Sequence, residues 1–375
     1  MERSLLARRG SLRVLLVADA GIGEAVARRA LDCFLEQDDA SAQVEVTCLG
    51  RGLINQTYQV AAAQHQWVLQ RVNPIFDPAI HHNIQAVTER LQQAGLTTPV
   101  LQRTQAGHPW ADLGQDGIWR MMTHIQGTSF DVAQSVDQAR AAGALVARFH
   151  SALAGLDHAF VGLRQGVHDT EQHLRRLTDA LALHPAHRLH GAVAPLAADI
   201  MAASAELPPL PDLAQQVGHG DLKLNNLLFA GPEPPASDQA ICLIDLDTLG
   251  PMTLAHELGD AWRSWCNQAG EDDTEAHFDL PIFEASWQGY RQHGGHQLDR
   301  TERRGLLFGV EWICLELAAR FAADALNESY FGWSSERYAT RGEHNLQRAR
   351  GQLALHRATA ATRPARAKLL GVPTS

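Results

Sequence analysis

The spacing of apolar residues divides the chain into a strand-rich first part and a helical second part. Apolar side chains recur every three or four positions over residues 23–36 and 80–94, which predicts two amphipathic helices. Short apolar or alternating runs predict strands at residues 44–50, 57–63, 67–72, 98–103 and 117–125. Gly21 and Gly23 lack the third small residue of a dinucleotide-binding fingerprint, so we interpret them as a helix start with no βαβ unit.

After Gly127 the pattern becomes mainly helical. Alanine-rich helical segments cover residues 135–156 and 170–183, and the proline-rich stretch LPPLPD then interrupts the pattern. Two strands, residues 226–229 and 241–245, flank the polar loop GPEPPASD. Most of the chain from His256 to about His356 is predicted to be helical, and residues 359–375 are expected to form a loose tail.

Composition and charge narrow the class of protein. The 375 residues are 45% hydrophobic and 20% charged, an ordinary globular balance, and no apolar run approaches the ~18–20 residues of a membrane span. The net charge of -10 argues against nucleic-acid or membrane partners, and the N-terminal apolar run lacks a signal-peptide cleavage site. No protein partner can be inferred from these features.

The five cysteines are scattered and form no CxxC pair, which argues against a disulfide scaffold and against a zinc site. This usage of cysteine is typical of a reducing compartment. We therefore expect a cytoplasmic enzyme.

The stretch HGDLKLNN, residues 219–226, carries the spacing of a kinase catalytic loop. In phosphoryl transfer a carboxylate orients the acceptor hydroxyl, and Asp221 is the candidate. Lys223 would reach the travelling phosphoryl group, and Asn226 would give a neutral oxygen to Mg²⁺. The chain has only one other lysine, Lys368, so a lysine at this position is notable.

The stretch LIDLDT would supply the second half of a magnesium site. Asp245 ends the apolar run ICLI, so its carboxylate should emerge at a strand tip. Asp247 follows two residues later and would face the same side of an extended chain. Taken alone, an apolar strand followed by two aspartates is also a common surface turn. Its combination with HGDLKLNN favours the metal site.

A cover for nucleotide phosphates is predicted at GRGLINQT, residues 50–57. Glycines let backbone N–H groups approach phosphate oxygens closely, and polar side chains add donors. The residues of this candidate cover are Gly50, Gly52, Asn55 and Thr57. An ordinary hairpin turn is the alternative interpretation.

The cation that contacts the phosphates must be an arginine, because no lysine precedes Leu222. The candidate is Arg71, in the strand predicted at residues 67–72. Its expected partner is Glu89, on the helix that follows. The alternative is an arginine at a strand edge without a role in binding.

Together these stretches carry a family resemblance. HGDLKLNN with LIDLDT resembles the aminoglycoside phosphotransferase and choline kinase superfamily, relatives of the protein kinases. The stretches GRGLINQTYQV, WVLQRVN, WRMMTHIQGTSFD and LNESYF resemble its N-acetylhexosamine 1-kinase branch, a likeness that runs from about Gly50 to Leu355.

The resemblance implies an α+β fold of the bilobal protein-kinase type. Its parts would be a small antiparallel-sheet N-terminal lobe at residues 1–122, a hinge at 123–127, a larger mainly helical C-terminal lobe at 128–358 and the tail at 359–375.

The resemblance also assigns roles to single residues. Asp221 would be the catalytic carboxylate, with Asn226 and Asp245 as magnesium ligands. The hinge, including Met122 and His124, would hold adenine through backbone groups. The residues expected near the acceptor are Arg320, Tyr330 and Asp260. One departure is Glu257, because relatives carry an aspartate there; the longer carboxylate could still brace the catalytic loop.

The expected function is an ATP- and Mg²⁺-dependent kinase that phosphorylates the anomeric hydroxyl of a hexose or N-acetylhexosamine. Three alternatives stay open. A kinase of an amino alcohol, a homoserine-like compound or an aminoglycoside would use carboxylates such as those of EDDTE, residues 271–275, for a cationic acceptor. A nucleotide-binding regulatory protein would commonly have lost one of the three site residues. A metal-dependent hydrolase would need a histidine-rich cluster.

Overall fold

The computed structural model describes residues 13–16, 23–35, 43–49, 54–62, 65–164, 166–294 and 297–374. The chain forms two compact units. The first unit comprises Met1–Glu89, Pro99–Ile125 and Ala159–Gly162, and the second comprises Arg90–Thr98, Gln126–His158 and Leu163–Ser375. Each unit is described by itself below.

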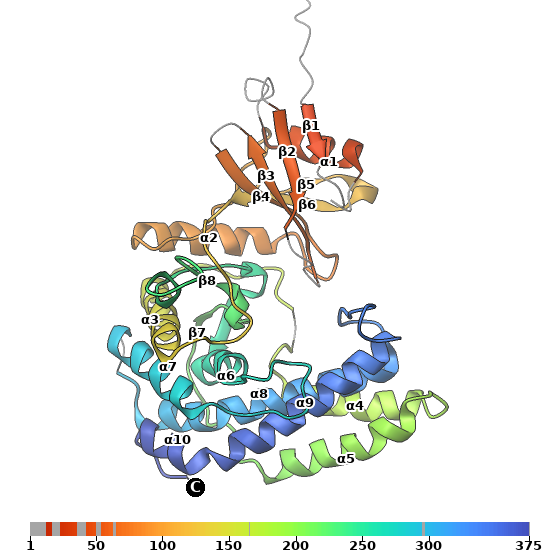
Figure 1. Cartoon of the computed structure of the whole chain (residues 1–375), viewed down its shortest axis with the longest axis vertical. Helices are drawn as coiled ribbons and strands as arrows, with labels where there is room; N and C mark the ends of the chain where they lie inside the picture. Colours follow the sequence, from red (N-terminus) through yellow and green to blue (C-terminus); the bar gives the residue numbers. More distant parts are fainter. Residues whose placement is uncertain are drawn as a thin grey trace, which may run out of the picture. The chain divides into compact units, whose positions relative to one another are not determined.

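The first unit contains a six-stranded sheet with the order β1-β2-β3-β4-β6-β5 (Figure 1). Its strands are β1 Arg13–Leu16, β2 Gln43–Cys48, β3 Gln56–Ala62, β4 His65–Arg71, β5 Ala111–Asp112 and β6 Ile118–Thr123, and its helices are α1 Glu24–Asp32 and α2 Ile80–Gln93. The strands pair antiparallel except for β1, which runs parallel to β2. The helix α1 lies between β1 and β2 in the chain, so a βαβ connection is present where the sequence predicted none.

One face of this sheet and one face of α1 form the core of the unit. Val44 and Val46 of β2 and Tyr58 and Val60 of β3 alternate with more exposed residues, as expected for half-buried strands. Residues 98–103 form no strand, contrary to the prediction; only Leu101 makes an isolated bridge, to Met122. Pro99 lacks a backbone N–H, which weakens any continuous ladder there.

The second unit is mainly helical. Its helices are α3 Val136–Leu153, α4 Thr170–Leu183, α5 His190–Glu206, α6 Leu254–Trp265, α7 Leu280–His293, α8 Arg300–Asn327, α9 Arg341–Ala361 and α10 Arg363–Leu370. Two short antiparallel strand pairs complete it: β7 Gln215–Gly218 with β10 Gly250–Thr253, and β8 Leu227–Phe229 with β9 Ala240–Leu243. The expected α+β fold is confirmed, with an antiparallel sheet followed by a mainly helical region.

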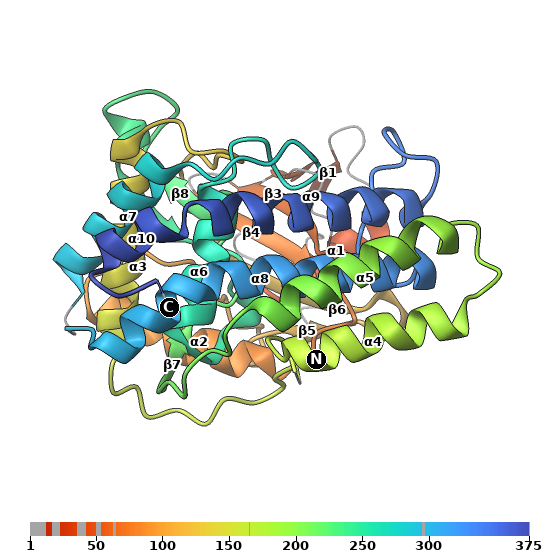
Figure 2. The ribbon, with the colours of Figure 1, turned by 90° about the horizontal axis from the view of Figure 1, so that it is seen from below.

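The long helix α8 is central to the second unit. Figure 2 shows α9 on one side of it and α4 and α5 on the other, and α6 also packs against it. Because neighbours surround it, α8 is buried on most of its faces. A Cβ at Gly309 would lie 2.1 Å from the carbonyl oxygen of Ala255, so only glycine lets α6 approach α8 this closely. This contact fixes α6, which supports the candidate site.

The predicted loose tail is wrong. The helix α9 continues to Ala361, and α10 follows it directly. Arg366 of α10 is fully buried, donates to the backbone carbonyl of Leu307, and lies 2.5 Å from Glu311 of α8. The segment is ordered by charges that meet a partner more than 50 residues earlier in the chain. Within the part of the chain that the structure describes, no helix has the length and apolar character to cross a membrane.

Candidate active site

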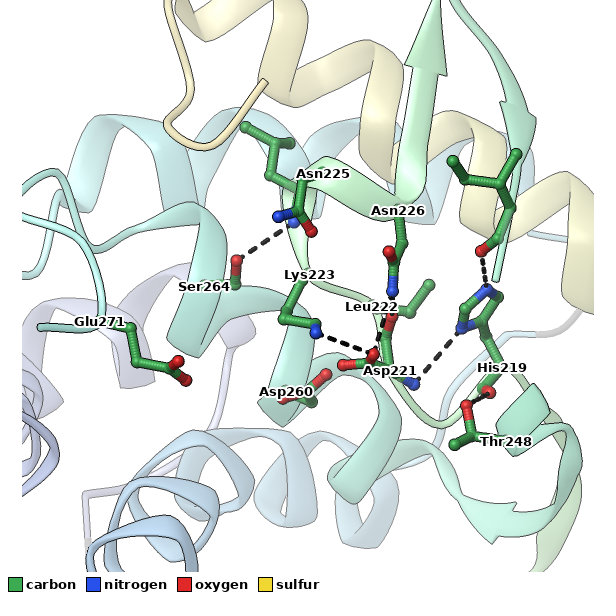
Figure 3. Close-up of polar contacts among 12 residues, drawn as sticks. His219, Asp221, Leu222, Lys223, Asn225, Asn226, Thr248, Asp260, Ser264 and Glu271 are labelled. Atoms are coloured by element: carbon green, nitrogen blue, oxygen red, sulfur yellow. Dashed lines mark hydrogen bonds and ion pairs between the residues drawn. The ribbon is translucent and has the colours of Figure 1, made fainter. Parts of the chain in front are cut away.

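The loop HGDLKLNN joins β7 to β8 and gathers three of the predicted side chains (Figure 3). The Nζ of Lys223 lies 3.0 Å from Oδ2 of Asp221. The side-chain amide of Asn226 donates to the backbone carbonyl of Asp221 at 2.8 Å and to Oδ2 at 3.1 Å. Asp221, Lys223 and Asn226 are therefore in direct contact, and the Asp221 carboxylate has a fixed orientation.

Lys223 lies among negative charges. The charge of Asp221, helped by those of Glu271 and Asp245, raises the pKa of Lys223 above its ordinary value, although burial acts in the opposite direction. The raised pKa favours the charged ammonium form at neutral pH. A fixed positive charge beside Asp221 suits a contact with a phosphoryl group.

Asp245 follows β9 and has an unusual backbone conformation. Its φ of 62° and ψ of 61° are left-handed, which costs ~1–3 kcal/mol for a residue other than glycine and is concentrated at functional sites. The preceding residue holds it there: the Ile244 N–H donates to Asn226, and the Ile244 carbonyl accepts from His219.

The expected arrangement of Asp245 and Asp247 on one side of an extended chain is wrong. Because Asp245 is left-handed and Leu246–Thr248 forms a 3₁₀ turn, the period-2 rule for strands does not apply. Asp247 lies in that turn with 6% of its surface exposed.

His219 ties the loop to the end of β9, a role that the sequence did not suggest. Its ring is fully buried; Nε2 donates to the carbonyl of Ile244 at 2.9 Å, and Nδ1 accepts from the N–H of Asp221. Its own carbonyl accepts from the hydroxyl of Thr248 at 2.8 Å. Gly220 is required beside it, because its φ is +79° and a Cβ would lie 2.6 Å from the Thr248 carbonyl. The candidate catalytic loop and the strand end that precedes Asp245 are thus joined by hydrogen bonds.

Side chains of α6 hold the backbone of the loop through hydrogen bonds. Glu257 accepts from the N–H of His219 at 2.7 Å and from that of Gly220 at 3.0 Å. Further along the helix, Ser264 accepts from the N–H of Leu224, and the Trp265 indole donates to the carbonyl of Leu222. The expectation that Glu257 can brace the loop in place of an aspartate is confirmed by these bonds.

The Glu257 carboxylate is buried but remains ionised. Burial alone would raise its pKa, but the hydrogen bond and charge of His150, with the charge and N–H of His219, hold it below its ordinary value of 4.5. His150 in turn contacts the Tyr290 hydroxyl at 2.9 Å. A buried network from α3, α6 and α7 therefore orients the backbone of the catalytic loop.

Glu257→Gln is expected to lower the free energy of unfolding by about 2–3 kcal/mol at pH 7, because bonds to a buried charged acceptor are lost. A lowered folded-state pKa gives stability that is complete above pH ~4.5 and is lost as the pH falls through the folded value. Urea denaturation of wild type and variant should therefore show a difference that narrows below pH 4.5. A difference that stays constant or widens as the pH falls would contradict an ionised Glu257.

Asp260 lies next to Asp221 in Figure 3. Its Oδ1 accepts from Arg263 at 2.7 Å, and Arg263 also contacts Glu271 at 3.3 Å. Burial would raise the pKa of Asp260, but the charge of Arg263 outweighs it and the pKa is lowered. The other oxygen, Oδ2, is buried and has no hydrogen-bond partner among the described residues.

Arg320 and Tyr330, the other expected acceptor contacts, lie in the same unit. Arg320 lies 3.5 Å from the buried carboxylate of Glu316. Tyr330 is exposed, and the guanidinium of Arg164 lies over its ring at 5.1 Å from the centroid. Asp324 fixes the Tyr330 loop by accepting from the backbone N–H groups of residues 329–331.

The acidic stretch 271–275 is engaged by arginines and a histidine. Glu271 pairs with Arg263, and Asp272 lies within 3.1 Å of Arg337, His344 and Arg348. Glu271 and Asp272 are thus already paired with cations, whereas Asp273 and Glu275 are exposed. Where the structure describes the chain, no group of three His, Cys, Asp or Glu side chains could hold a metal ion.

The nucleotide cover lies partly outside the described residues, since Gly50 and Gly52 fall there. Asn55 is nearly buried, and its side-chain oxygen accepts from the N–H of Asn73 at 2.9 Å. The hydroxyl of Thr57 accepts from Gln70 at 2.9 Å. Asn55 therefore holds the turn against the segment after β4.

Arg71 ends β4, and its guanidinium packs beside Gly117, where a Cβ would lie 3.0 Å from Nε. The predicted Arg71–Glu89 ion pair is absent from the contacts of the described residues; Glu89 is exposed and accepts from Gln85, four residues earlier on α2. In the expected hinge, Met122 of β6 pairs with Val68 of β4, and the His124 N–H donates to the carbonyl of Gln66.

Comparisons with known proteins show the family and the fold of the chain. A family model described as the phosphotransferase enzyme family, APH, matches residues 45–295. A similar solved structure is amicoumacin kinase in complex with AMP-PNP, Ca²⁺ and Ami, at 13% identity and a TM-score of 0.59, covering 89% of this chain and 94% of that chain. A microcompartment-associated aminopropanol kinase is 18% identical with a TM-score of 0.57, covering 94% of this chain and 100% of that chain.

A third similar structure is an aminoglycoside phosphotransferase from Alicyclobacillus acidocaldarius, at 14% identity and a TM-score of 0.53, covering 92% of this chain and 97% of that chain. At these identities the structures establish the fold, and the resemblance to the superfamily is confirmed. The N-acetylhexosamine 1-kinase branch stays a prediction. Since the family model covers the segment from β2 through the catalytic loop and α7, the chain belongs to the phosphotransferase enzyme family, and it is an ATP-dependent phosphotransferase that acts on a hydroxyl group.

Proposed function

We propose that this small-molecule kinase uses Asp221 to orient the acceptor hydroxyl for attack on the γ-phosphorus of ATP. The observation that carries the proposal is the fixed Asp221 carboxylate, which Lys223 and Asn226 contact within a loop that α6 braces. A carboxylate held in this way can accept a hydrogen bond from the hydroxyl and direct its lone pair. The new bond joins the acceptor oxygen to the γ-phosphorus, the bond to the β-phosphate oxygen breaks, and the proton leaves through Asp221.

Lys223 is proposed to stabilise the negative charge of the transferred group. Its Nζ lies 3.0 Å from Asp221, and its raised pKa, caused first by the Asp221 charge, keeps it positive. It thus places a cation next to the hydroxyl that Asp221 orients. Asp247, buried in the adjacent turn, is proposed to support the metal site.

The donor set fits Mg²⁺. The amide nitrogen of Asn226 is directed at Asp221, so the amide oxygen is the atom left for a ligand role, and Asp245 adds a carboxylate at a strand tip. Hard oxygen donors in small number suit an ion that keeps phosphate and water ligands. When bound, Mg²⁺ would neutralise charge on the phosphates. AMP-PNP and Ca²⁺ in the similar amicoumacin kinase support a nucleotide with a divalent cation here.

In the first unit we propose that Arg71 and Thr57 contact the nucleotide phosphates, together with Gly50 and Gly52. Arg71 suits this role because no acidic side chain pairs with it among the described residues of that unit. Asn55 keeps the turn in place through Asn73. The backbone of residues 122–125 would hold adenine.

For the acceptor we propose a neutral sugar, a hexose or N-acetylhexosamine that offers its anomeric hydroxyl. The supporting observation is that the carboxylates near Asp221 already have cationic partners: Asp260 and Glu271 share Arg263. An amino alcohol is the second candidate, supported by the full-length fold similarity to aminopropanol kinase.

The test is to incubate the protein with ATP, Mg²⁺ and a panel of free sugars, amino alcohols and aminoglycosides while ADP release is measured. We expect turnover with at least one neutral sugar and loss of it when EDTA removes the metal. Turnover restricted to amino alcohols would replace the sugar proposal by the second candidate. ATP binding without turnover of any acceptor would contradict the proposed catalysis.

A further inference from the structure

A second polar cluster lies in the helical unit and combines Asp260 and Arg320, which the sequence placed near the acceptor, with three residues that the sequence did not single out. We name it the His168 cluster: His168, His256, Asp260, Glu316 and Arg320. Glu316 lies at its centre with 1% of its side chain exposed. Its Oε1 lies 3.4 Å from Nδ1 of His168 and 3.5 Å from Arg320, and its Oε2 accepts from the Thr170 hydroxyl at 3.3 Å. The cluster thus draws on α6, α8 and the segment before α4.

The surroundings of the two histidines in the cluster shift their pKa values in opposite directions. Their rings stack at 4.9 Å with an interplanar angle of 7°. Burial lowers the pKa of His168, but the contact and charge of Glu316 with the charge of Asp260 outweigh it, so the pKa is raised. Burial, followed by the charge of His168, lowers the pKa of His256 to about 4. Glu316 therefore favours the protonated form of His168, whereas burial favours the neutral form of His256.

Three buried polar atoms of the cluster lack a hydrogen-bond partner among the described residues: Oδ2 of Asp260 and both ring nitrogens of His168. Of the two nitrogens, Nδ1 faces Glu316 at 3.4 Å as an ion-pair contact, so Nε2 is the one without a charged neighbour at contact distance in the part of the chain that the structure describes. Asp260 is 8% exposed, and the side chain of His168 is 15% exposed. Buried unsatisfied polar atoms are rare in native proteins, and each calls for an explanation such as a ligand. Oδ2 of Asp260 is an acceptor, and Nε2 of His168, in a protonated ring, is a donor.

The position of Asp260 links this cluster to catalysis. Figure 3 shows its carboxylate next to that of Asp221. The charge of Asp260 raises the pKa of His168, and the charge of Lys223 lowers the pKa of Asp260. The three groups are therefore close enough to interact electrostatically. An acceptor whose hydroxyl meets Asp221 would extend toward these unpartnered atoms.

We propose that Oδ2 of Asp260 and Nε2–H of His168 bind polar groups of the acceptor beyond the reacting hydroxyl, and that His168, held by Glu316, determines acceptor specificity. This inference rests on the proposed function. A donor next to an acceptor matches a hydroxyl or amide group, which offers both. The cluster is specific for a neutral, polyhydroxylated acceptor.

The charges of the cluster disfavour a cationic acceptor such as an amino alcohol. Each carboxylate here has a cation: Asp260 has Arg263, and Glu316 has both Arg320 and His168. An ammonium group near Nε2 of His168 would lie close to the guanidinium of Arg320, and the nearby carboxylates are already balanced by cations, so the site disfavours it.

The experiment compares His168→Phe with His168→Gln on the best neutral acceptor. Phenylalanine keeps a ring for stacking on His256 but removes both nitrogens, whereas glutamine keeps one N–H donor. We expect His168→Phe to raise the acceptor KM by ~10- to 100-fold, the value of one lost charged hydrogen bond, with the KM for ATP within ~3-fold of wild type. His168→Gln should recover part of the loss.

His184→Phe serves as the control, because this histidine contacts Asn327 away from the cluster and should keep wild-type kinetics. Acceptors that lack single hydroxyl or acetyl groups give a second readout. For the analogue that lacks the group bound by His168, the effect of His168→Phe should shrink to less than ~3-fold, because the two losses are coupled.

The outcomes separate the two proposals. An unchanged acceptor KM in His168→Phe, or equal losses on every analogue, would overturn the role of His168 while leaving the kinase activity established. Wild-type preference for a hexosamine with a free amine over its N-acetyl form would overturn the neutral acceptor class, and this needs no variant. Failure of the wild type to phosphorylate any acceptor would instead overturn the proposed function.

Discussion

Asp221→Asn is expected to lower kcat by ~10²- to 10⁴-fold, the range that a positioned general base contributes. Asparagine has nearly the same shape but cannot accept the acceptor proton. It would also present an amide nitrogen to Lys223 or to the Asn226 amide, both of which now donate to the carboxylate. The fall should appear in kcat with little change in the KM for ATP. Steady-state ADP release with the best acceptor measures both parameters.

The matched control is Asp179→Asn, which removes an exposed carboxylate from α4 and should leave kcat within ~2-fold, as expected for a surface change. Thermal unfolding of both variants excludes a loss caused by misfolding. A kcat for Asp221→Asn within a few-fold of the wild-type value would show that another group orients the hydroxyl. Equal losses in both variants would point to an effect of net charge.

The contact among the side chains of the candidate catalytic loop could be predicted from sequence because these residues lie close together in the chain. Asp221, Lys223 and Asn226 lie within six positions, so a short loop followed by a turn brings them together with little help from the rest of the fold. The sequence spacing of these three residues therefore indicates that their side chains lie close together. The same holds for most strands and helices, whose apolar period of two or 3.6 residues reports directly which face is buried.

Backbone conformation at Asp245 could not be read in the same way. The period-2 rule places Asp245 and Asp247 on one side only if the chain stays extended. The left-handed conformation of Asp245 depends on bonds from Ile244 to Asn226 and His219, which come from other parts of the chain. A single sequence gives no signal for such bonds.

Partners far apart in the chain were the main source of error. The Arg71–Glu89 pair was predicted from position alone, but Glu89 on an exposed face of α2 meets Gln85 instead. His168 and Glu316 are 148 residues apart, and neither lies in a recognisable motif. Their association depends on how α8 packs against the segment before α4, which is a property of the tertiary fold.

The charged residues of α10 also have partners that are distant in the sequence. Of the contacts discussed here, we expect these to contribute most to stability. Arg363 and Arg366 look like a solvated tail in the sequence, but both pair with Glu311, whose side chain is fully buried within α8. Glu311→Gln would leave two guanidinium groups without their anion. Breaking a buried ion pair from one side costs ~3–5 kcal/mol, so the free energy of unfolding of the helical unit should fall by about this amount.

Urea denaturation at constant pH measures this change, and two comparisons establish its cause. Glu171→Gln removes an ion pair to Arg175 that is largely exposed, and it should cost less than ~1 kcal/mol. The double variant Glu311→Met with Arg366→Met removes both fully buried charges and should regain most of the lost stability, because apolar replacements of a buried pair are often neutral or stabilising. If the double variant is as unstable as Glu311→Gln, the loss comes from packing in α8 and not from stranded charge. If Glu311→Gln costs no more than Glu171→Gln, the order of the last helix does not depend on Glu311.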